Sequence, residues 1–558
     1  MLELFIQLYM GNLMKKIISV LFIISFSFQV VAKSNKKFDV LLNELFSKDG
    51  PGGVALVVKD GKTIYRKAFG MANLELGVKM KPENVFRIGS ITKQFTATAI
   101  MQLIEQGKIK LDDDITKYIK DYPTHGYTIT IENLLTHTSG IKSYTGLKKW
   151  TSEVRKKNFT PKEMVDYFKS EPMDFAPGEK FMYDNSGYFL LGYIIEIVSG
   201  QTYAEYIQQH IFTPIGMKNS YYGGNSPIIK NRAAGYAKDD NGYKNDEFLS
   251  MTQPFAAGSL LSTVDDLSTW YAAVMSDKVM TKASRSKAHS VFTLNDGSKT
   301  DYGFGWAIGN IQGSPMVSHG GGINGFLSAS NYLPEERVFV AVLSNCMCNS
   351  PADVADKMAA IAIGKPFEWE QVHLDEDFLK SYVAVYSSKS DGDRIITFDK
   401  GKLYSRRTGG SKFELLPYAK DKFFFDSDTV TLEFLRDAQN KINATILKST
   451  QSDKQWQRTD KPIPTITKIE VDEELFKKYV GEYALTQNFH LKVFKLDGKM
   501  YTQATGQSKL EIVGTALHKF SLIGVDAQLT FNFNENDQVI SVTLHQNGDH
   551  EAKRLDSL

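Results

Sequence analysis

The sequence feature that most constrains this chain is an internal repeat in its C-terminal third. Three pairs of landmarks are each separated by 97 residues: Tyr382 and Tyr479, Gly401 and Gly498, and Phe434 and Phe531. A constant offset means that two copies of one folding unit follow each other without insertions between these landmarks. Both copies consist of short runs that alternate polar and apolar residues, a pattern typical of small antiparallel β-barrels. The sequence therefore predicts two barrels, over residues 376–458 and 473–558, joined by the Pro/Thr linker Thr459–Lys468.

The preceding residues, 38–364, alternate between strand-like and helix-like segments. Two β-rich runs flank the pair Asp60-Gly61, which favours a tight hairpin. Strand-like sequence returns at Tyr302–Asn310 and at Val338–Asn345, and apolar residues recur at helical spacing in several stretches between these strands. Strands at both ends with helices between them predict an α/β sheet domain that a mostly helical domain interrupts.

The charge balance excludes one class of partner. The 558 residues include 66 Lys and Arg against 64 Asp and Glu, and the net charge of +2 is spread along the chain. A protein that binds nucleic acid needs a basic block or stripe to follow the phosphate backbone, and this sequence contains none. We therefore expect no nucleic-acid partner.

The N-terminal region has the pattern of an export signal. From Met14 the sequence MKKIISVLFIISFSFQVVA places two lysines before an apolar run, with Val30 and Ala32 at the positions that precede a cleavage site. This order matches a secretory signal peptide over residues 14–32 that is cut after Ala32. We expect a periplasmic or secreted protein, with an uncleaved membrane anchor as the alternative.

The chain has two cysteines, Cys346 and Cys348, with one residue between them. A bond between such close neighbours would close no useful loop, so we expect the exported chain to be stabilised by its cores. We interpret the pair as two small apolar residues just after a buried strand rather than as a redox or metal site. The sequence also lacks the His/Cys spacing of zinc sites, and we expect no metal and no cofactor.

The stretch FRIGSITKQFTATAI places Ser90 and Lys93 three residues apart at the start of a strongly apolar helix. Residues with this spacing lie on one face of a helix, so the lysine reaches the serine hydroxyl. A buried lysine loses its charge more easily and can then accept the serine's proton, which is what an activated nucleophile requires. The alternative is a helix-capping serine beside a solvated lysine, and the same spacing recurs at Ser34, Ser139 and Ser284.

Two further motifs favour the nucleophile interpretation. Tyr183 and Asn185 form a Tyr-x-Asn motif just ahead of an apolar helix. The same motif at Tyr243 lies in a polar loop that offers no pocket for a phenol, so Tyr183 is the better candidate. His319 opens the run His-Gly-Gly-Gly in a strand-rich stretch, where small residues let a substrate backbone approach an edge strand.

The three motifs, in this order along the chain, resemble those of serine hydrolases of the class C β-lactamase and penicillin-binding protein type. The resemblance covers residues 38–364 and extends to three further landmarks: LLTHTSGI from Leu134, AAGSLLSTVDDLSTW from Ala256 and NYLPEERVFVAVLSN from Asn331. The fold that it implies is a β-lactamase-like sheet domain with an inserted helical domain. The two C-terminal barrels are similar to the lipocalin-like domains on some of these peptidases, where they can serve assembly, which allows a homo-oligomer through the barrels.

The resemblance implies a covalent acyl-enzyme mechanism. Ser90 would attack a carbonyl group while Lys93 and Tyr183 share the proton transfer, and which of these two is the base stays open. The backbone N–H groups of Ser90 and Gly322 would form the oxyanion hole, and Asn185 would hydrogen-bond the amide of the substrate. The site residues implied are catalytic Ser90, Lys93 and Tyr183, and substrate-binding Asn185, His319, Gly321 and Gly322.

One position departs from the β-lactamase pattern. Those enzymes usually carry Lys-Thr-Gly on the strand where this chain has His319-Gly320-Gly321. A lysine is a permanent cation for a substrate carboxylate, whereas a histidine is mostly uncharged near neutral pH. His-x-Gly is familiar among the peptidases and esterases of this family. We therefore expect a small peptide or ester substrate, with D-amino-acid and cell-wall peptides included, and at most weak β-lactamase activity.

Two other interpretations stay open to different degrees. HGGG also occurs in the oxyanion loop of α/β-hydrolase lipases, but that fold needs a G-x-S-x-G nucleophile elbow, which the sequence lacks. The second alternative is a non-enzymatic sensor or wall-binding protein that keeps the acylation site and has little turnover. A sequence shows an acylation site better than it shows a deacylation rate, so it does not decide between an enzyme and a sensor.

Overall fold

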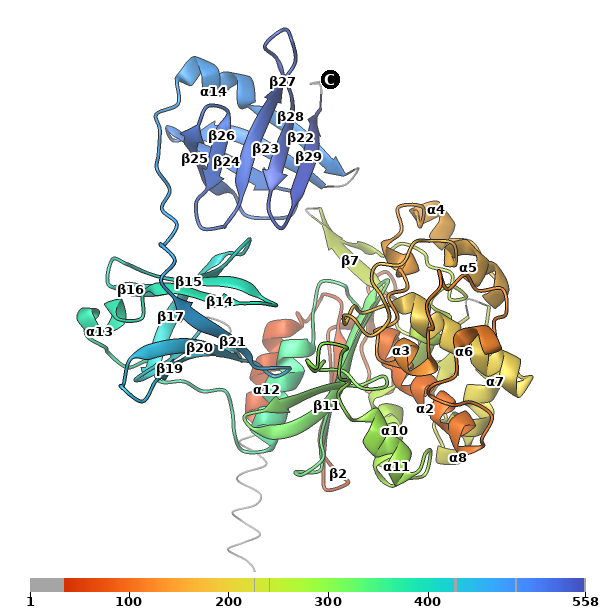
Figure 1. Ribbon diagram of the computed structural model, residues 1–558. Helices are drawn as coiled ribbons and strands as arrows, with labels where there is room; N and C mark the ends of the chain where they lie inside the picture. The colour runs from red at the N-terminus through yellow and green to blue at the C-terminus, as the bar shows by residue number, and fades with distance from the viewer. Residues whose placement is uncertain (1–34, 225, 240, 426–428, 487–488, 556–558) are drawn as a thin grey trace, which may run out of the picture. The chain divides into compact units, whose positions relative to one another are not determined.

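The computed structural model (Figure 1) describes residues 35–224, 226–239, 241–425, 429–486 and 489–555. The predicted signal peptide, residues 14–32, lies outside the described residues. The chain divides into two compact units, of which the first ends at Phe367 and the second runs from Glu368 onward apart from Thr450–Ser452. Within the described ranges, no helix combines the length and the apolar character needed to cross a membrane.

The first unit is built on a six-stranded antiparallel sheet with the strand order β10-β11-β12-β13-β1-β2. Within this sheet β1 pairs with β13, so strands from the two ends of the unit lie side by side. This arrangement confirms the predicted sheet that helices interrupt. The strands are β1 (Gly53–Lys59), β2 (Lys62–Phe69), β10 (Ala307–Ile311), β11 (Ser314–Ile323), β12 (Phe326–Leu333) and β13 (Val338–Ser344).

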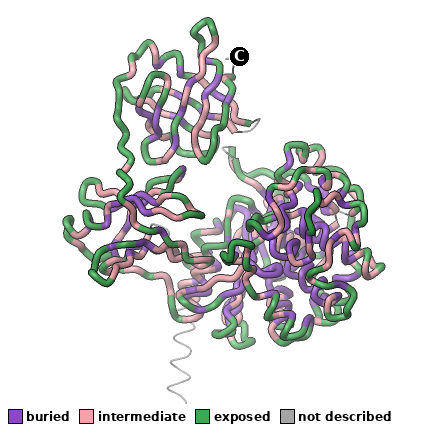
Figure 2. The backbone as a smooth tube through the Cα atoms, in the orientation of Figure 1, coloured by how far each residue is buried: buried purple, intermediate pink, exposed green. Residues whose placement is uncertain are grey.

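The turn between β1 and β2 and the two faces of the sheet follow from the sequence pattern. Asp60 and Gly61 both have a positive φ, 51° and 73°, as a two-residue hairpin turn requires. On β1, Val54 and Ala55 belong to different cores, because successive strand residues point to opposite faces. The helix over residues 35–45 and α12 (Ala352–Ala362) pack on one face, and Figure 2 shows the buried backbone gathered in this unit's strands and central helices.

The helical part of this unit covers the other face of the sheet and is centred on α2, which buries polar as well as apolar side chains. The helices are α2 (Thr92–Glu105), α3 (Ile131–Leu135), α4 (Ser152–Arg155), α5 (Pro161–Phe168), α6 (Asn185–Ser199), α7 (Tyr203–Ile207), α8 (Thr213–Ile215), α9 (Phe255–Gly258), α10 (Val264–Met275) and α11 (Lys282–Ala288). The short strands are β3 (Met71–Asn73), β4 (Val78–Lys79), β5 (Phe86–Arg87), β6 (Tyr221–Tyr222), β7 (Tyr236–Asp239), β8 (Gly242–Asn245) and β9 (Leu260–Ser262). They form three further small sheets, β3-β4, β5-β9-β6 and β7-β8.

One predicted strand is shorter than expected. The sequence predicts a strand at Tyr302–Asn310, but β10 begins only at Ala307. Gly305 has a φ of 83°, and a Cβ on Gly303 would lie 2.1 Å from the backbone oxygen of Ala288. These two glycines bend the chain and press it against a neighbouring segment, so the residues before Ala307 leave the sheet.

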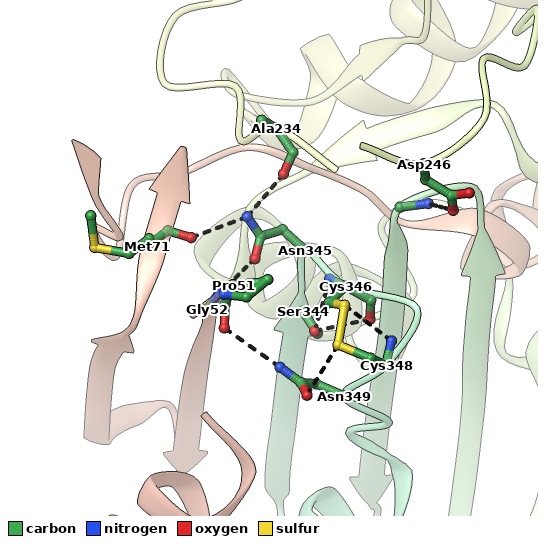
Figure 3. The surroundings of a disulfide bond; sticks show 11 residues. Pro51, Gly52, Met71, Ala234, Asp246, Ser344, Asn345, Cys346, Cys348 and Asn349 are labelled. Atoms are coloured by element: carbon green, nitrogen blue, oxygen red, sulfur yellow. Dashed lines mark hydrogen bonds between the residues drawn. A yellow bond between two sulfur atoms is a disulfide. The ribbon is translucent and has the colours of Figure 1, made fainter. Parts of the chain in front are cut away.

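The cysteine prediction is wrong, because Cys346 and Cys348 form a disulfide (Figure 3). Their Cα atoms lie 5.1 Å apart in the turn after β13, within the range that a disulfide spans. Both the N–H and the C=O of Cys346 are bonded to the hydroxyl of Ser344, which fixes this turn. The neighbouring Asn345 accepts a hydrogen bond from the N–H of Gly52 at 2.7 Å, so the turn is tied to the start of β1.

The second unit contains two closed eight-stranded barrels, which confirms the predicted pair. The first is β14 (Ala384–Ser388), β15 (Gly392–Asp399), β16 (Lys402–Arg407), β17 (Lys412–Ala419), β18 (Lys422–Phe424), β19 (Thr431–Arg436), β20 (Ile442–Lys448) and β21 (Lys454–Thr459). The second is β22 (Gly481–Thr486), β23 (Phe489–Leu496), β24 (Lys499–Ala504), β25 (Leu510–Ala516), β26 (Lys519–Leu522), β27 (Gln528–Phe533), β28 (Val539–His545) and β29 (Asp549–Arg554). A short helix precedes each barrel, α13 (Glu376–Lys380) and α14 (Glu473–Tyr479).

The repeat is visible in individual hydrogen bonds. In the first barrel the hydroxyl of Tyr386 donates to the backbone oxygen of Tyr382, and in the second Tyr483 donates in the same way to Tyr479. An arginine on the last strand of each barrel, Arg458 or Arg554, also donates to two backbone oxygens in the segment just before the first strand of that barrel. The shared bonds show that the constant offset in the sequence marks two copies of one barrel.

Candidate active site

Ser90 lies in a single 3-10 turn, η1 (Gly89–Ile91), between β5 and α2. Its side chain is half-buried, and its hydroxyl lies 3.2 Å from Nζ of Lys93. Among the described residues, neither η1 nor α2 takes a side-chain hydrogen bond at its N-terminus, so Ser90 does not act as a helix cap. The serine is therefore held beside the lysine and is free of a capping role.

Lys93 is fully buried, with 0% of its surface exposed. Its Nζ donates to Oδ1 of Asn185 at 2.8 Å and to the backbone oxygen of Ala257 in α9 at 2.9 Å. Both partners are carbonyl oxygens, which can only accept hydrogen bonds. When the amine is neutral, these two carbonyls take its two hydrogens, and the lone pair is left for the hydroxyl of Ser90.

The charge state of Lys93 is set by burial and by one carboxylate. Burial lowers the pKa of Lys93 to about 7, and the nearby carboxylate of Asp184 opposes this change. Asp184 is also buried, and burial raises its pKa, while the N–H groups of Gly187 and Ser186 oppose that change. Those two N–H groups bond the carboxylate at 2.8 and 2.7 Å, so Asp184 also caps α6. A substantial share of Lys93 is neutral near pH 7.

Tyr183 lies at the open side of this group. Its ring centre is 4.7 Å from Nζ of Lys93, and 38% of the residue is exposed. Burial of the phenol oxygen raises the pKa of Tyr183, and a hydrogen bond with Ser90 opposes the change only in part. The phenol is therefore protonated near neutral pH, when it can donate its proton. The second Tyr-x-Asn motif lies elsewhere, since Nδ2 of Asn245 donates to Oε1 of Glu75 at 2.6 Å.

Asn185 is the first residue of α6, and both ends of its amide are oriented. Oδ1 accepts from Lys93, and Nδ2 donates to the hydroxyl of Thr145 at 3.2 Å. The backbone N–H of Asn185 donates to Oγ of Ser143 at 3.2 Å. Nδ2 carries two hydrogens, so one of them is left for an acceptor on a substrate.

The strand β11 presents the glycine run along a partly open edge. β10 pairs with β11 from Ser314 to Ser318, whereas β12 pairs with it from Val317 to Ile323. Among the described strands, the segment from His319 onward therefore has one neighbour. Such an edge can hydrogen-bond the backbone of an extended peptide.

Two glycines bring this strand up to the serine turn. A Cβ on Gly89, whose φ is 51°, would lie 2.9 Å from the backbone nitrogen of Gly322. A Cβ on Gly321 would lie 2.1 Å from the backbone oxygen of Ile88. Any larger side chain at either position would push β11 away from Ser90. This close approach is what the predicted oxyanion hole of Ser90 and Gly322 would require.

His319 is 7% exposed, and both of its ring nitrogens are bonded. Nδ1 bonds the backbone oxygen of Gly320, so Nδ1 carries the proton, and Nε2 then accepts from the hydroxyl of Tyr302 at 2.8 Å. Burial, aided by the charge of Lys93, lowers the pKa of His319 to about 3. His319 is therefore neutral, and its contact with a substrate stays a prediction.

Sequence reasoning missed two aromatic residues behind the site. Nδ1 of His137 accepts a hydrogen bond from the N–H of Asp184 at 3.0 Å, and its ring centre lies 4.3 Å from that of Tyr183. Burial lowers the pKa of His137 well below its usual value. His137 belongs to the stretch LLTHTSGI, which the sequence analysis noted as a family landmark without assigning a function to its residues. Tyr302 lies in a segment that was predicted to be a strand.

The site contains amine, phenol and amide groups but offers little to a cation. Within the described ranges, no cluster of three or more His, Cys, Asp or Glu side chains is arranged to hold a metal ion. The chemistry that the residues themselves support is attack by a serine hydroxyl on a carbonyl carbon, with an amine as base and backbone N–H groups as oxyanion donors.

Comparison with known proteins agrees with this geometry. Residues 35–365 match the Beta-lactamase protein family. Penicillin-binding protein 4* of Bacillus subtilis (strain 168) is 30% identical over 430 residues, which cover 72% of this chain and 94% of that protein. The octameric penicillin-binding protein homologue from Pyrococcus abyssi has 29% identity and a TM-score of 0.54, over 76% of this chain and 99% of that one.

A D-stereospecific amidohydrolase from Streptomyces sp. has 25% identity and a TM-score of 0.51, over 59% of this chain and 98% of that one. The family match spans more than half of the chain and includes Ser90, Tyr183 and His319 with the motifs that they open. The resemblance noted in the sequence is thereby confirmed. The chain belongs to the beta-lactamase family and is a serine hydrolase.

Proposed function

We propose that this serine hydrolase forms an acyl-enzyme on Ser90. Its substrates would be peptides, amides or esters whose acyl group carries no charge near the site. The observation that carries the proposal is the arrangement around Lys93. Its amine is buried, two carbonyl oxygens take its hydrogens, and the hydroxyl of Ser90 lies at the remaining position, 3.2 Å away. An amine with a pKa of about 7 in this orientation is a general base for Ser90.

In the first half of the reaction, Oγ of Ser90 bonds to the substrate carbonyl carbon and its proton passes to Nζ of Lys93. The backbone N–H groups of Ser90 and Gly322 bind the oxyanion that forms. When the tetrahedral intermediate collapses, the bond to the leaving amine or alcohol breaks. The protonated phenol of Tyr183 supplies the proton to the leaving group and recovers one from Lys93. Water then hydrolyses the ester on Ser90 by the same steps in reverse.

The substrate class follows from the absence of a fixed cation on β11. His319 itself is neutral. Among the described groups that affect its pKa, Lys93 is the one that carries a positive charge. A free carboxylate on the substrate would find no permanent positive charge at this position. Amides, esters and peptides that place no free carboxylate at this position, D-amino-acid and cell-wall peptides included, fit better than penicillins. The likeness to a D-stereospecific amidohydrolase supports this choice.

The similarity to Penicillin-binding protein 4* favours a second candidate, a binding or sensor protein that is acylated and turns over slowly. The two candidates differ in one measurement. With an excess of a chromogenic ester, an enzyme releases product steadily, whereas a sensor gives one burst that matches the protein concentration. Export through residues 14–32 is part of either proposal and rests on the sequence.

The nucleophile and its base can be tested by covalent labelling. We expect Ser90→Ala to abolish labelling by a fluorophosphonate, and Lys93→Ala to slow it by roughly 10²–10⁴-fold, because general-base assistance is lost. Ser284→Ala is the matched control, since Ser284 and Lys287 have the same spacing on α11. Labelling of folded Ser90→Ala at the normal rate would rule out Ser90 as the nucleophile.

The base predicts a pH dependence. Acylation requires the neutral amine, and the pKa of Lys93 is about 7, so the rate should rise with pH through about 7 and level off above it. Asp184→Asn removes a carboxyl group whose ionised form favours the charged amine, but it keeps a side-chain cap for α6. The rising limb should therefore move to lower pH. A limb that stays in place or moves upward, measured by labelling rates, would contradict this role of Asp184.

The neutral histidine predicts selectivity. We expect His319→Lys to raise the ratio of activity on carboxylate-bearing substrates to activity on neutral esters, because it adds a fixed cation beside β11. His319→Gln, which is neutral, is the control and should leave the ratio unchanged. Paired turnover of a chromogenic cephalosporin and a nitrophenyl ester measures both. An unchanged ratio in His319→Lys would show that position 319 does not contact the acyl donor.

The barrels are the surface for self-association in this proposal, as the octameric relative suggests. Their strands lie outside the residues of the candidate site, so a chain that ends at Gly364 should keep labelling at Ser90. We expect the full chain to sediment as an oligomer and the shortened chain as a monomer in analytical ultracentrifugation. The same oligomeric state for both chains would place the interface on the first unit or rule out assembly.

A further inference from the structure

A chain of hydrogen bonds between buried polar side chains lies behind the candidate site. α2 contributes Gln94, the residue after Lys93, and α10 contributes Trp270 and Tyr271. Nε1 of Trp270 donates to Oε1 of Gln94 at 3.0 Å, and Nε2 of Gln94 donates to the hydroxyl of Tyr271 at 2.7 Å. All of these side chains are buried.

This chain of bonds continues to the strand that carries the glycine run. The hydroxyl of Tyr271 lies 3.2 Å from Oγ of Ser330 on β12, and Oγ of Ser330 donates to the backbone oxygen of His319 at 3.2 Å. An indole N–H can only donate and a carbonyl can only accept, so every hydrogen bond points from Trp270 toward His319. The arrangement has one pattern of donors and acceptors and therefore one geometry.

A second serine on the same face of β12 makes a parallel tie. Oγ of Ser328 donates to the backbone oxygen of Ile88 at 2.9 Å, and Ser328 pairs with Gly321 across the sheet. Ser328 thus joins the segment just before Ser90 to β12. Ser330 joins β11, through Tyr271, to the helix just after Ser90.

These bonds connect the two halves of the oxyanion site. One backbone donor, on Ser90, lies in the turn that leads into α2, and the other, on Gly322, lies on β11. The two donors must lie within about 0.5 Å of their working positions, and a shift of about 1 Å can cost a reaction on the order of 10²-fold. A rigid connection between α2 and β11 is therefore expected to matter to the reaction as well as to the fold.

We propose that Gln94, Tyr271 and Ser330 are positioning residues that fix β11 against α2, so that the N–H groups of Ser90 and Gly322 address one oxyanion. The inference rests on the proposed acylation of Ser90. It assigns to the chain of bonds a role beyond satisfying its own polar groups. If these residues only satisfied each other's hydrogen bonds, substitutions would lower the stability of the fold without a specific loss of catalytic rate.

The matched test compares two buried tyrosines that bond to α2. Tyr271 bonds Gln94 on α2, and Tyr203 bonds Oγ1 of Thr96 on the same helix at 2.7 Å. Thr96 in turn donates to the backbone oxygen of Ala256 in α9, so this second chain of bonds does not lead to β11. Tyr271→Phe and Tyr203→Phe each remove one hydroxyl from a fully buried ring. Both should lower the midpoint of thermal unfolding by similar amounts.

Only Tyr271→Phe should affect the reaction. We expect kcat for a nitrophenyl ester to fall about tenfold with KM unchanged, because the oxyanion forms only in the transition state. Tyr203→Phe should stay within about twofold of the unaltered protein. Equal losses in the two variants, or no loss in Tyr271→Phe, would overturn the proposal.

Ser330→Ala keeps the bond between Gln94 and Tyr271 and removes only the link to His319, so it tests the same point if Tyr271→Phe folds poorly. Its loss in kcat should match that of Tyr271→Phe, and the double variant should lose little more, since the two residues act in series. Additive losses would mean that the residues act independently, which contradicts the proposal.

Hydrogen exchange separates this inference from the proposed function. The amides of β11 from His319 to Ile323 should exchange faster in Tyr271→Phe than in Tyr203→Phe. Unaltered protein that fails to react with the ester would refute the proposed acylation, and the exchange comparison would still decide whether the chain of bonds holds β11. Equal exchange of β11 in the two variants would overturn the inference.

Discussion

The chemistry proposed for this protein depends on keeping one amine, that of Lys93, out of water. An isolated ammonium is costly to bury, so Lys93 gives up part of its charge, and its pKa falls to about 7. What makes the buried amine useful is that its neighbours are unequal. Two carbonyl oxygens can only accept from it, the serine hydroxyl can donate to it, and the carboxylate of Asp184 keeps the charged form accessible after the proton has moved.

Keeping that amine dry and oriented explains much of the surrounding fold. α2 packs against other helices, so most of its polar residues are buried, and Lys93, Gln94 and Thr96 find hydrogen-bond partners there. The sheet supplies the other half of the site, and it can approach only because Gly89 and Gly321 lack side chains. The serines of β12 then tie this approach to fixed points on both sides of Ser90. In the proposed mechanism, separate contacts therefore position the base and the oxyanion donors around Ser90.

The parts of this picture that the sequence predicted are those set by local geometry. The spacing of Ser90 and Lys93 predicts their contact because one helical turn brings them together, and the constant offset predicts two barrels because it is a property of the chain itself. His137 and Tyr302 were missed because only tertiary packing brings them behind Tyr183. The disulfide was missed because its small loop gives no entropic reason to form it, although the turn after β13 sets the two Cα atoms at a suitable distance.

The exchange of a lysine for His319 links selectivity to basicity. A lysine at this position would add a second cation near Lys93, and like charges make it harder for either amine to hold a proton. The structure shows this repulsion acting on the histidine, since the positive charge of Lys93 helps to lower the pKa of His319. With a neutral histidine bonded to Tyr302 and Gly320, Lys93 keeps a pKa of about 7, and the strand carries no lysine that could bind a substrate carboxylate. In the proposed function, a site for uncharged acyl groups and a base that titrates near neutral pH are therefore two results of the histidine that stands where the family pattern has a lysine.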